Sequence, residues 1–265
     1  MGNKRLISIA AGVSPELEDD PCTFVEVAAK AGWKGTGVWF DPLSWTDKTT
    51  KEVRKRIDDT SLTVVDMEVV RMGPDGDCGE RLVDAASSIG AKNILTISSF
   101  DSVEATAERL NELCTYAHSS NIRVCIEFMR FTSIRTLADA LKVVELVDQD
   151  NVGILVDLIH VFRSGTTYNE IRAVDAALFP YAQWCDAMAE PSGWSTKELI
   201  RDAVDDRAIP GEGNLPMEEF ELLFDISVPF SVEVRSKALR DTFPDFLDRA
   251  KHLLSATSNA ITFTG

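Results

Sequence analysis

Four polar side chains stand inside apolar runs in the second half of the sequence. They are Glu127 in VCIEFM, Asp157 in ILVDLIH, Gln183 in YAQWCDAM and Glu233 in SVEVRS. Each has aliphatic or aromatic neighbours, so we expect each to be partly desolvated. Three carboxylates that converge at one place repel one another and partly protonate. A divalent cation would neutralise most of that charge, so these residues indicate metal-assisted chemistry.

A simpler explanation applies to any one of these acids, because strands often end in an acid where the chain leaves the core. That explanation is weaker for four residues on successive segments. The seventh segment also offers a second acid, Asp186, three residues after Gln183. Strand alternation places Gln183 and Cys185 on one face and Asp186 on the other, which favours Gln183 as the contribution of this segment.

To bring these residues together, the strands must run in parallel and end at one edge. Short apolar runs alternate with amphipathic segments along the chain. The expected strands are residues 5–12, 35–40, 62–70, 93–100, 122–129, 152–160, 181–188 and 230–235. The expected helices are residues 23–33, 48–58, 79–90, 102–121, 137–149, 168–178, 195–204, 216–225 and 243–256. Strands separated by helices imply parallel pairing, because a parallel crossover needs a dozen or more residues.

Eight such units predict a (β/α)8 TIM barrel of the α/β class, whose usual length is about 250 residues. An open doubly wound sheet is the competing fold, but the turn after the first strand reads AAGVSP and not GxGxxG. Because the chain shows no linker and no low-complexity segment, we expect residues 1–265 to form a single domain. Chemistry in a TIM barrel takes place at the carboxyl ends of the strands.

Composition narrows the function classes. A formal charge of −16 argues against a nucleic-acid partner, because binding a phosphate backbone relies on Lys and Arg. The five cysteines include no CxxC pair, which suits reduced thiols. No window approaches the ~20 apolar residues that cross a bilayer, and the first residues make a poor signal peptide. We therefore expect a cytoplasmic protein with a small polar substrate and no membrane partner; a homo-oligomer is compatible with the sequence.

This constellation resembles the xylose isomerase-like TIM-barrel family, also described as the sugar phosphate isomerase/epimerase and AP endonuclease family 2 superfamily. Sugar epimerases, inosose dehydratases and isomerases, 3-dehydroshikimate dehydratases and endonuclease IV-type proteins belong to it. The resemblance extends from AAKAGWKGTGVWF to SVEVRS. Its most specific parts are the fifth-strand glutamate, the D-x-x-H of the sixth strand and the loop RAIPGEGNLP.

The resemblance implies a metal centre. Glu127, Asp157, Gln183 and Glu233 would hold one divalent ion, and Glu127 and Glu233 would also act as the catalytic acid/base pair. The seventh strand of many relatives reads H-x-x-D, whereas here it reads QWCD, so Gln183 replaces a histidine. An all-oxygen ligand set is harder than one with imidazole, which favours Mn²⁺ or Mg²⁺, with Co²⁺ or Zn²⁺ as alternatives.

The resemblance also implies substrate contacts. His160 would bind a substrate oxygen, and Arg207 would reach the substrate from the loop before PGEG. Trp39 and Phe162 follow the second and sixth strands and would pack on the substrate, although aromatic residues also serve to bury loops. The alternative for His160 is a loop histidine that bonds to backbone. Gly37 stands where many relatives have a glutamate, which implies a roomier pocket.

The function so implied is a metal-dependent isomerase or epimerase. It would act on a ketose, keto-polyol or related hydroxy-ketone through a metal-stabilised enediolate. The alternative is a metal-dependent lyase of the same superfamily, similar to inosose or 3-dehydroshikimate dehydratases, or acting on a larger glycoside-like substrate. Endonuclease chemistry would need a histidine-rich cluster, and this chain has three histidines in all. A noncatalytic barrel would hold no stoichiometric metal.

Overall fold

The eight strands of the barrel follow one another around it in chain order. The computed structural model describes residues 4–261. Every neighbouring pair is parallel, and β8 pairs with β1 to close the barrel. The strands are β1 (Ile7–Ile9), β2 (Gly35–Trp39), β3 (Thr63–Met72), β4 (Asn93–Ser98), β5 (Arg123–Glu127), β6 (Val152–Asp157), β7 (Ala182–Trp184) and β8 (Phe230–Val232). The predicted TIM barrel is confirmed.

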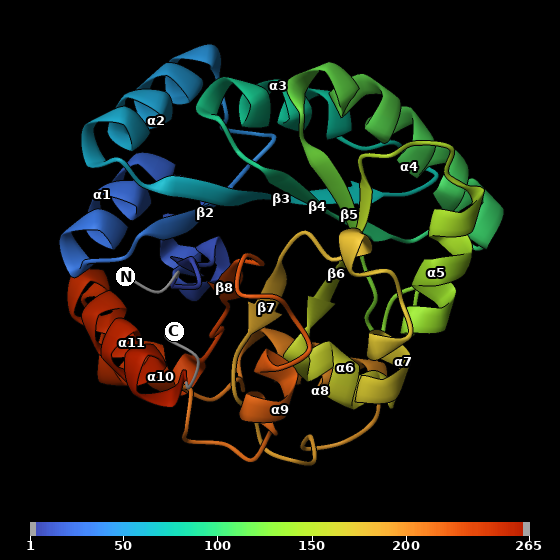
Figure 1. Ribbon diagram of the computed structural model, residues 1–265. Helices are drawn as coiled ribbons and strands as arrows, with labels where there is room; N and C mark the ends of the chain where they lie inside the picture. The colour runs from blue at the N-terminus through green and yellow to red at the C-terminus, as the bar shows by residue number, and fades with distance from the viewer. Residues whose placement is uncertain (1–3, 262–265) are drawn as a thin grey trace.

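Helices surround the strands on the outside of the barrel (Figure 1). They are α1 (Pro21–Ala31), α2 (Asp47–Thr60), α3 (Gly79–Ile89), α4 (Val103–Ala117), α5 (Leu137–Leu146), α6 (Leu158–Ser164), α7 (Tyr168–Arg172), α8 (Thr196–Val204), α9 (Met217–Glu221), α10 (Lys237–Thr242) and α11 (Phe246–Ala260). Short 3₁₀ turns are η1 (Ala11–Val13), η2 (Pro15–Leu17), η3 (His118–Ser120) and η4 (Ala176–Leu178).

Local sequence explains where several helices begin and end. Thr46, Thr136 and Ser195 each form a capping box at the start of a helix, in which side chains satisfy backbone N–H groups that have no partner within the helix. Gly32 and Gly90 end α1 and α3 with φ values of 102° and 82°. Glycine adopts this left-handed conformation without the steric cost that a Cβ brings.

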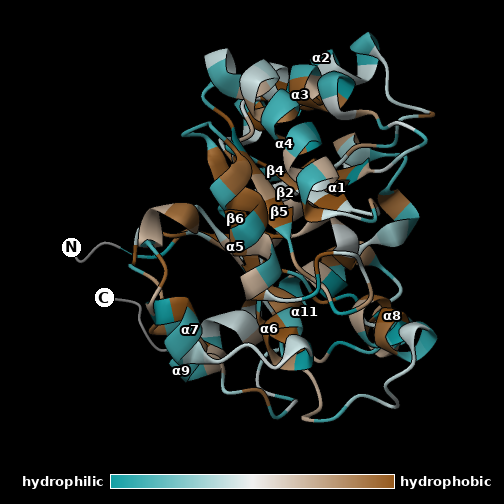
Figure 2. Cartoon of the chain, turned by 90° about the vertical axis from the view of Figure 1, so that its right-hand side faces the viewer, coloured by the Kyte–Doolittle hydropathy of each residue, from teal (hydrophilic) through white to brown (hydrophobic). Residues whose placement is uncertain are grey.

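Among residues 4–261, the buried apolar side chains form two separate clusters. The larger one fills the space between the strands and the surrounding helices. The smaller one lies on the opposite face of the strands. It comprises Val65, Leu95, Cys125, Leu155 and Tyr181, all at most 3% exposed. Figure 2 shows hydrophobic colouring concentrated on the interior strands and hydrophilic colouring on outer helices such as α2 and α7.

The observed elements differ from the predicted ones mainly at their ends. The first strand covers only Ile7–Ile9, because the chain then forms two short 3₁₀ turns. The sixth strand ends at Asp157, not at residue 160. The predicted last helix corresponds to α11, and the short helix α10 before it was not predicted. Within residues 4–261, no helix is both long and apolar enough to cross a membrane.

Candidate active site

The carboxyl ends of β5 to β8 carry the four residues that the sequence singled out. Glu127 and Asp157 are the last residues of β5 and β6, Gln183 is the middle residue of β7, and Glu233 directly follows β8. Asp157 and Gln183 are cross-strand partners. All four residues are at most 6% exposed. They therefore lie on four consecutive strands, and they are buried as expected.

A cavity of about 120 Å³, which we call the inner cavity, lies at this end of the barrel. The residues that line it and matter for the site are Trp39, Glu68, Glu127, Met129, Phe131, His160, Arg207, Glu233 and Arg235. Asp157 and Gln183 do not line the cavity. The two carboxylates of the predicted acid/base pair, Glu127 and Glu233, are thus accessible to a ligand in this cavity.

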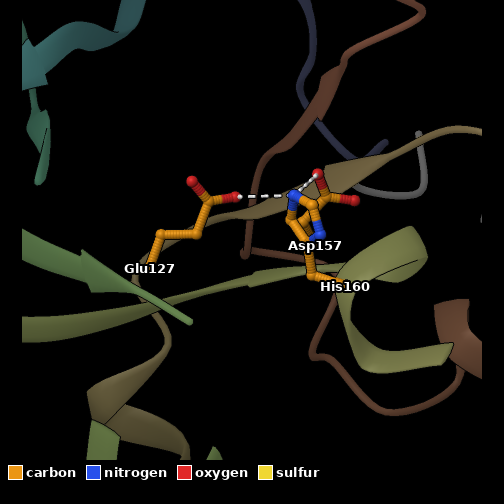
Figure 3. A group of neighbouring side chains, drawn as sticks. All are labelled: Glu127, Asp157 and His160. Carbon is orange, nitrogen blue, oxygen red and sulfur yellow. Dashed lines mark ion pairs between the residues drawn. The ribbon is translucent and has the colours of Figure 1, made fainter. Parts of the chain in front are cut away.

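Glu127, Asp157 and His160 form a compact group (Figure 3). One potential ligand atom from each residue lies within 4.8 Å of the others. His160 Nε2 is 3.8 Å from Glu127 Oε1 and 3.8 Å from Asp157 Oδ2. Two carboxylate oxygens and one imidazole nitrogen at such distances make a candidate site for a divalent metal.

The D-x-x-H motif acquires its geometry from a helix start. Asp157 is the N-cap of α6, and its Oδ1 accepts a hydrogen bond of 3.0 Å from the N–H of Ile159. His160 therefore stands in the first turn of α6 and not in the strand that the sequence predicted. Helical geometry brings its ring back over Asp157, because residues three apart share a helix face. Phe131 contacts the same ring edge-on, with ring centroids 5.7 Å apart.

Arg207 connects the carboxylates of β6 and β8. Its Nη1 donates to Asp157 Oδ2 at 2.7 Å, and its Nη2 lies 2.8 Å from Glu233 Oε2. Its Nε donates to the carbonyl of Ala203 at 2.7 Å, and the residue is 4% exposed. The predicted substrate contact is therefore a buried guanidinium that bridges two of the predicted metal ligands.

Buried carboxyl groups outnumber the cations around the cavity. Burial raises the pKa of Glu127 and of Glu68 well above the usual range, and neighbouring carboxylates raise both further. Burial also raises the pKa of Asp66, to about 7. The pKa of Glu233 is raised by burial even though Arg207 acts in the opposite direction. The cations nearby do not neutralise all of these carboxyl groups, and a divalent ion would supply the positive charge that stabilises their ionised forms.

Asp157 and His160 behave differently from these acids. Burial raises the pKa of Asp157, but the charge and hydrogen bond of Arg207, with the N–H of Ile159, bring it below the ordinary value, so this carboxylate is ionised. Burial lowers the pKa of His160 to about 4. The imidazole is therefore neutral near pH 7, and one of its nitrogens has a lone pair available for a metal or a substrate proton.

Gln183 is a buried polar group whose amide oxygen fits a metal ligand. The residue is fully buried, and neither atom of its amide has a hydrogen-bond partner among the described residues. A buried amide without a partner is costly, and an ion bound through its oxygen would offset part of that cost. Asp157 also retains capacity, because each carboxylate oxygen can accept more than one bond. The buried, oxygen-rich donors around Gln183 therefore fit a hard divalent cation.

Asp186, the alternative contribution of the seventh strand, has a different role. Its carboxylate accepts hydrogen bonds from the backbone N–H groups of Gly211, Gly213 and Leu215, at 2.8 to 3.1 Å. A Cβ on Gly213 would clash with that carboxylate. Asp186 therefore holds the PGEG loop, which lies just after Arg207, and the glycines allow the loop to fold around it.

Of the two aromatic residues predicted to contact the substrate, one lines the inner cavity and the other does not. Trp39 lines the inner cavity, and the guanidinium carbon of Arg235 lies 5.8 Å from its ring centroid. Phe162 does not line it and packs against the large apolar cluster. The room expected beside Gly37 is absent, because a Cβ there would lie 3.0 Å from the N atom of Ala11 and 3.3 Å from Asp66 Oδ1. That expectation was wrong.

Sequence reasoning did not identify Asp66 as part of the site. It is fully buried, and burial and the charge of Glu233 raise its pKa although the hydroxyl of Ser231 acts in the opposite direction. Its charge raises the pKa of Glu68, second to the effect of burial. The available signal was an acid in the middle of the apolar run LTVVDMEVV.

Known proteins resemble this chain in part of its sequence or in its fold. A relative in Halalkalibacterium halodurans, "Inosose isomerase", is 26% identical over 112 residues, which are 42% of this chain and 37% of that protein. The match thus spans little more than a third of that relative. A solved structure of the IOLI protein with a bound zinc atom has a TM-score of 0.78 at 15% identity, covering 97% of this chain and 99% of that one.

A second solved structure, the probable 3-DHS dehydratase AsbF from Bacillus anthracis, has a TM-score of 0.70 at 15% identity. The match covers 96% of this chain and 99% of that one. Structural likeness at such low identity shows a common fold and nothing more. The sequence pattern of the family described as "Xylose isomerase-like TIM barrel" matches residues 25–252. That match includes all eight strands except β1, and the chain therefore belongs to the xylose isomerase-like TIM barrel family.

Proposed function

We propose that this protein is a divalent-metal-dependent isomerase or epimerase that acts on a ketose or a related polyol ketone. The observation that supports this most is the inner cavity, which Glu127 and Glu233 line beside a buried group of potential metal ligands. Membership of the family and the partial match to an inosose isomerase agree with a polyol ketone as substrate.

The donors proposed for the metal are Glu127, Asp157, Gln183 and Glu233. His160 is the competing donor, since it lies with Glu127 and Asp157 in one group and a structural relative holds zinc. A bound ion would act as a Lewis acid toward the carbonyl and an adjacent hydroxyl of the substrate. Either set requires Arg207 to share Asp157 with the ion.

The two glutamates would move the proton. In the barrel order, β5 and β8 are separated by β6 and β7, so Glu127 and Glu233 approach the cavity from different sides. One carboxylate removes the proton from the carbon next to the carbonyl, and the C–H electrons form the enediolate. The protonated partner then returns a proton to carbon, on the same or the other face. His160 and Arg207 would hold the substrate oxygens meanwhile.

The test is proton exchange in D₂O. The purified protein is stripped with a chelator, resupplied with one metal at a time, and incubated with D-fructose or an inosose. We expect deuterium at the carbon next to the carbonyl, together with a new isomer. We expect Mn²⁺, Mg²⁺ or Co²⁺ to restore exchange best, because the proposed ligands are oxygens. Recovery with Zn²⁺ alone would favour the set that includes His160.

Two other outcomes change the proposal. If the same proton is lost but an unsaturated, UV-absorbing product and water appear, the protein is a lyase of the dehydratase kind. If the purified protein contains no stoichiometric metal and no ketone exchanges deuterium with any metal, the barrel is not an enzyme of this class. Electron density after soaking crystals with these ketones and Mn²⁺ would then identify the ligand directly.

A further inference from the structure

A second and much larger cavity adjoins the inner cavity. Its volume is about 1060 Å³, and we call it the outer cavity. Segments that follow β1, β2 and β3 form its walls, with Pro15, Glu18, Asp41, Leu43 and Asp75 among the lining residues. The two cavities share Trp39, Val69 and Arg71. A ligand that reacts at Glu127 can therefore extend past Trp39 into the outer cavity.

The sizes of the cavities suggest how a substrate is divided between them. Ligand pockets in proteins usually measure about 300–1,000 Å³. The inner cavity, at about 120 Å³, is well below this range, whereas the outer cavity is at its upper limit. The inner cavity thus offers room for the reacting part of a substrate, and the outer cavity offers room for a second group of at least that size.

The residues that line the outer cavity suit a neutral ligand with many hydroxyl groups. Trp39 and the almost fully exposed Leu43 provide apolar surface for C–H groups. Glu18 and Asp75 provide acceptors for hydroxyl groups. The acids of this cavity argue against an anion. A sugar ring, with apolar faces and a rim of hydroxyl groups, matches such a mixture.

Arg71 is the shared residue with the clearest capacity for a ligand. It is exposed, and its side chain forms no hydrogen bond and no salt bridge with any residue between 4 and 261. Glu18 feels its charge without pairing with it. A guanidinium has five N–H donors in a planar fork, which can bond two adjacent hydroxyl groups. Its neighbour Arg81, by contrast, donates to the carbonyls of Pro42 and Trp45.

We propose that the outer cavity binds the second ring of a glycosylated ketose, with Arg71 on its hydroxyl groups, while the keto-sugar ring reacts in the inner cavity. This inference rests on the proposed function for the reacting ring only. Binding energy from the second ring would hold the reacting carbon in place, so the extension raises kcat/KM. The natural substrate is then a disaccharide or another glycoside and not a free ketose.

The experiment compares D-fructose with turanose, maltulose, leucrose and isomaltulose, in which glucose is attached to different hydroxyl groups of fructose. The rate of deuterium exchange gives kcat/KM for each sugar. We expect at least one glucosyl-fructose to exceed fructose by about tenfold. In Arg71→Ala and Asp75→Ala this ratio should fall toward one, whereas Arg172→Ala, on the exposed surface of α7, should keep it. The ratio within each variant cancels any common loss of activity.

A second measurement separates this inference from the proposed function. Methyl α-glucopyranoside has no ketone and probes the outer cavity alone. We expect saturation-transfer NMR signals from its ring protons with the wild type, and weaker ones with Arg71→Ala. If these signals appear while no ketose exchanges deuterium, the outer site stands and the proposed reaction fails. If fructose exchanges as fast as every disaccharide and the glucoside gives no signal, the outer site is overturned.

Discussion

The inner and outer cavities differ in how far the acids around them are buried. Around the inner cavity, Glu127, Asp157 and Glu233 are at most 6% exposed, and one guanidinium, that of Arg207, bridges two of them. Around the outer cavity, by contrast, Glu16, Asp19 and Asp75 are exposed, and the half-buried Glu18 lies 3.6 Å from Arg235.

This difference assigns separate tasks to two adjoining spaces. Charges interact more strongly where water is excluded, so small displacements of a proton or a cation have large effects in the inner cavity. Surface ion pairs are worth little, typically up to about 1 kcal/mol, so the outer cavity can exchange its partners for a ligand at small cost. We expect changes at the inner cavity to alter turnover and changes at the outer cavity to alter substrate choice.

The largest effect is expected for Glu127→Gln. An amide can neither take nor return a proton, so deuterium exchange should fall by about 10²–10⁴-fold, the usual contribution of a general acid or base. The rate in D₂O with Mn²⁺ measures this. Glu108→Gln, at an exposed position of α4, is the matched control and should leave the rate unchanged. A Glu127→Gln protein that keeps full activity would remove this glutamate from the mechanism.

The next effect separates metal binding from substrate binding within DLIH. Asp157→Asn removes a charge from the proposed metal ligands, so metal content should decrease. His160→Ala should keep the metal and lose a contact to a substrate oxygen. The barrier should rise by about 2–4 kcal/mol, as when one preorganised donor is removed, and kcat should fall together with kcat/KM. Elemental analysis alongside kinetics of both variants decides this. If His160→Ala loses its metal, the group of Glu127, Asp157 and His160 is the ligand set.

The order of the elements was predictable from the sequence because apolar periodicity and helix caps are local. The acids on β5, β6 and β8 were also predictable, since each interrupts an apolar run near a strand end. The residues at which strands end were harder to predict. The run ILVDLIH reads as one strand, but the side chain of Asp157 accepts the N–H of Ile159 and starts a helix there. A local hydrogen bond therefore prevailed over the apolar pattern.

Contacts between segments that are distant in the sequence could not be predicted from it. The bond between Arg207 and Asp157 joins residues 50 positions apart, and no local pattern encodes it. Phe162 illustrates the same limit, because the helix in which it lies turns it toward the apolar cluster and not toward the cavity. Asp66 was overlooked because an acid in the middle of an apolar run looks like an exception, although barrel closure brings it close enough to Glu233 for that charge to raise its pKa.

Asp66→Asn is expected to have the smallest effect on turnover. It tests how much the buried charge of Asp66 lowers the free energy of unfolding. The pKa of Asp66 is about 7 in the folded protein, raised mainly by burial, whereas the ordinary value is 3.8. A raised folded-state pKa contributes stability that is present below the unfolded-state value and is lost as pH rises through the folded-state value. With metal removed, Asp66→Asn should therefore gain stability relative to the wild type between about pH 4 and pH 7, and the difference should then level off.

The upper limit of that difference is about 4 kcal/mol, from 1.36 kcal/mol for each unit of pKa. His160 acts in the opposite direction, because its pKa is lowered to about 4, so its contribution is lost as pH falls below its ordinary range. Both proteins contain His160, and its effect cancels in the comparison. Urea unfolding of both proteins in EDTA from pH 4.5 to pH 8 measures the difference, with Asp101→Asn, at an exposed loop position, as the control. A difference that does not change with pH would mean that Asp66 is hydrated or paired, and that the charge around the inner cavity is balanced without a cation.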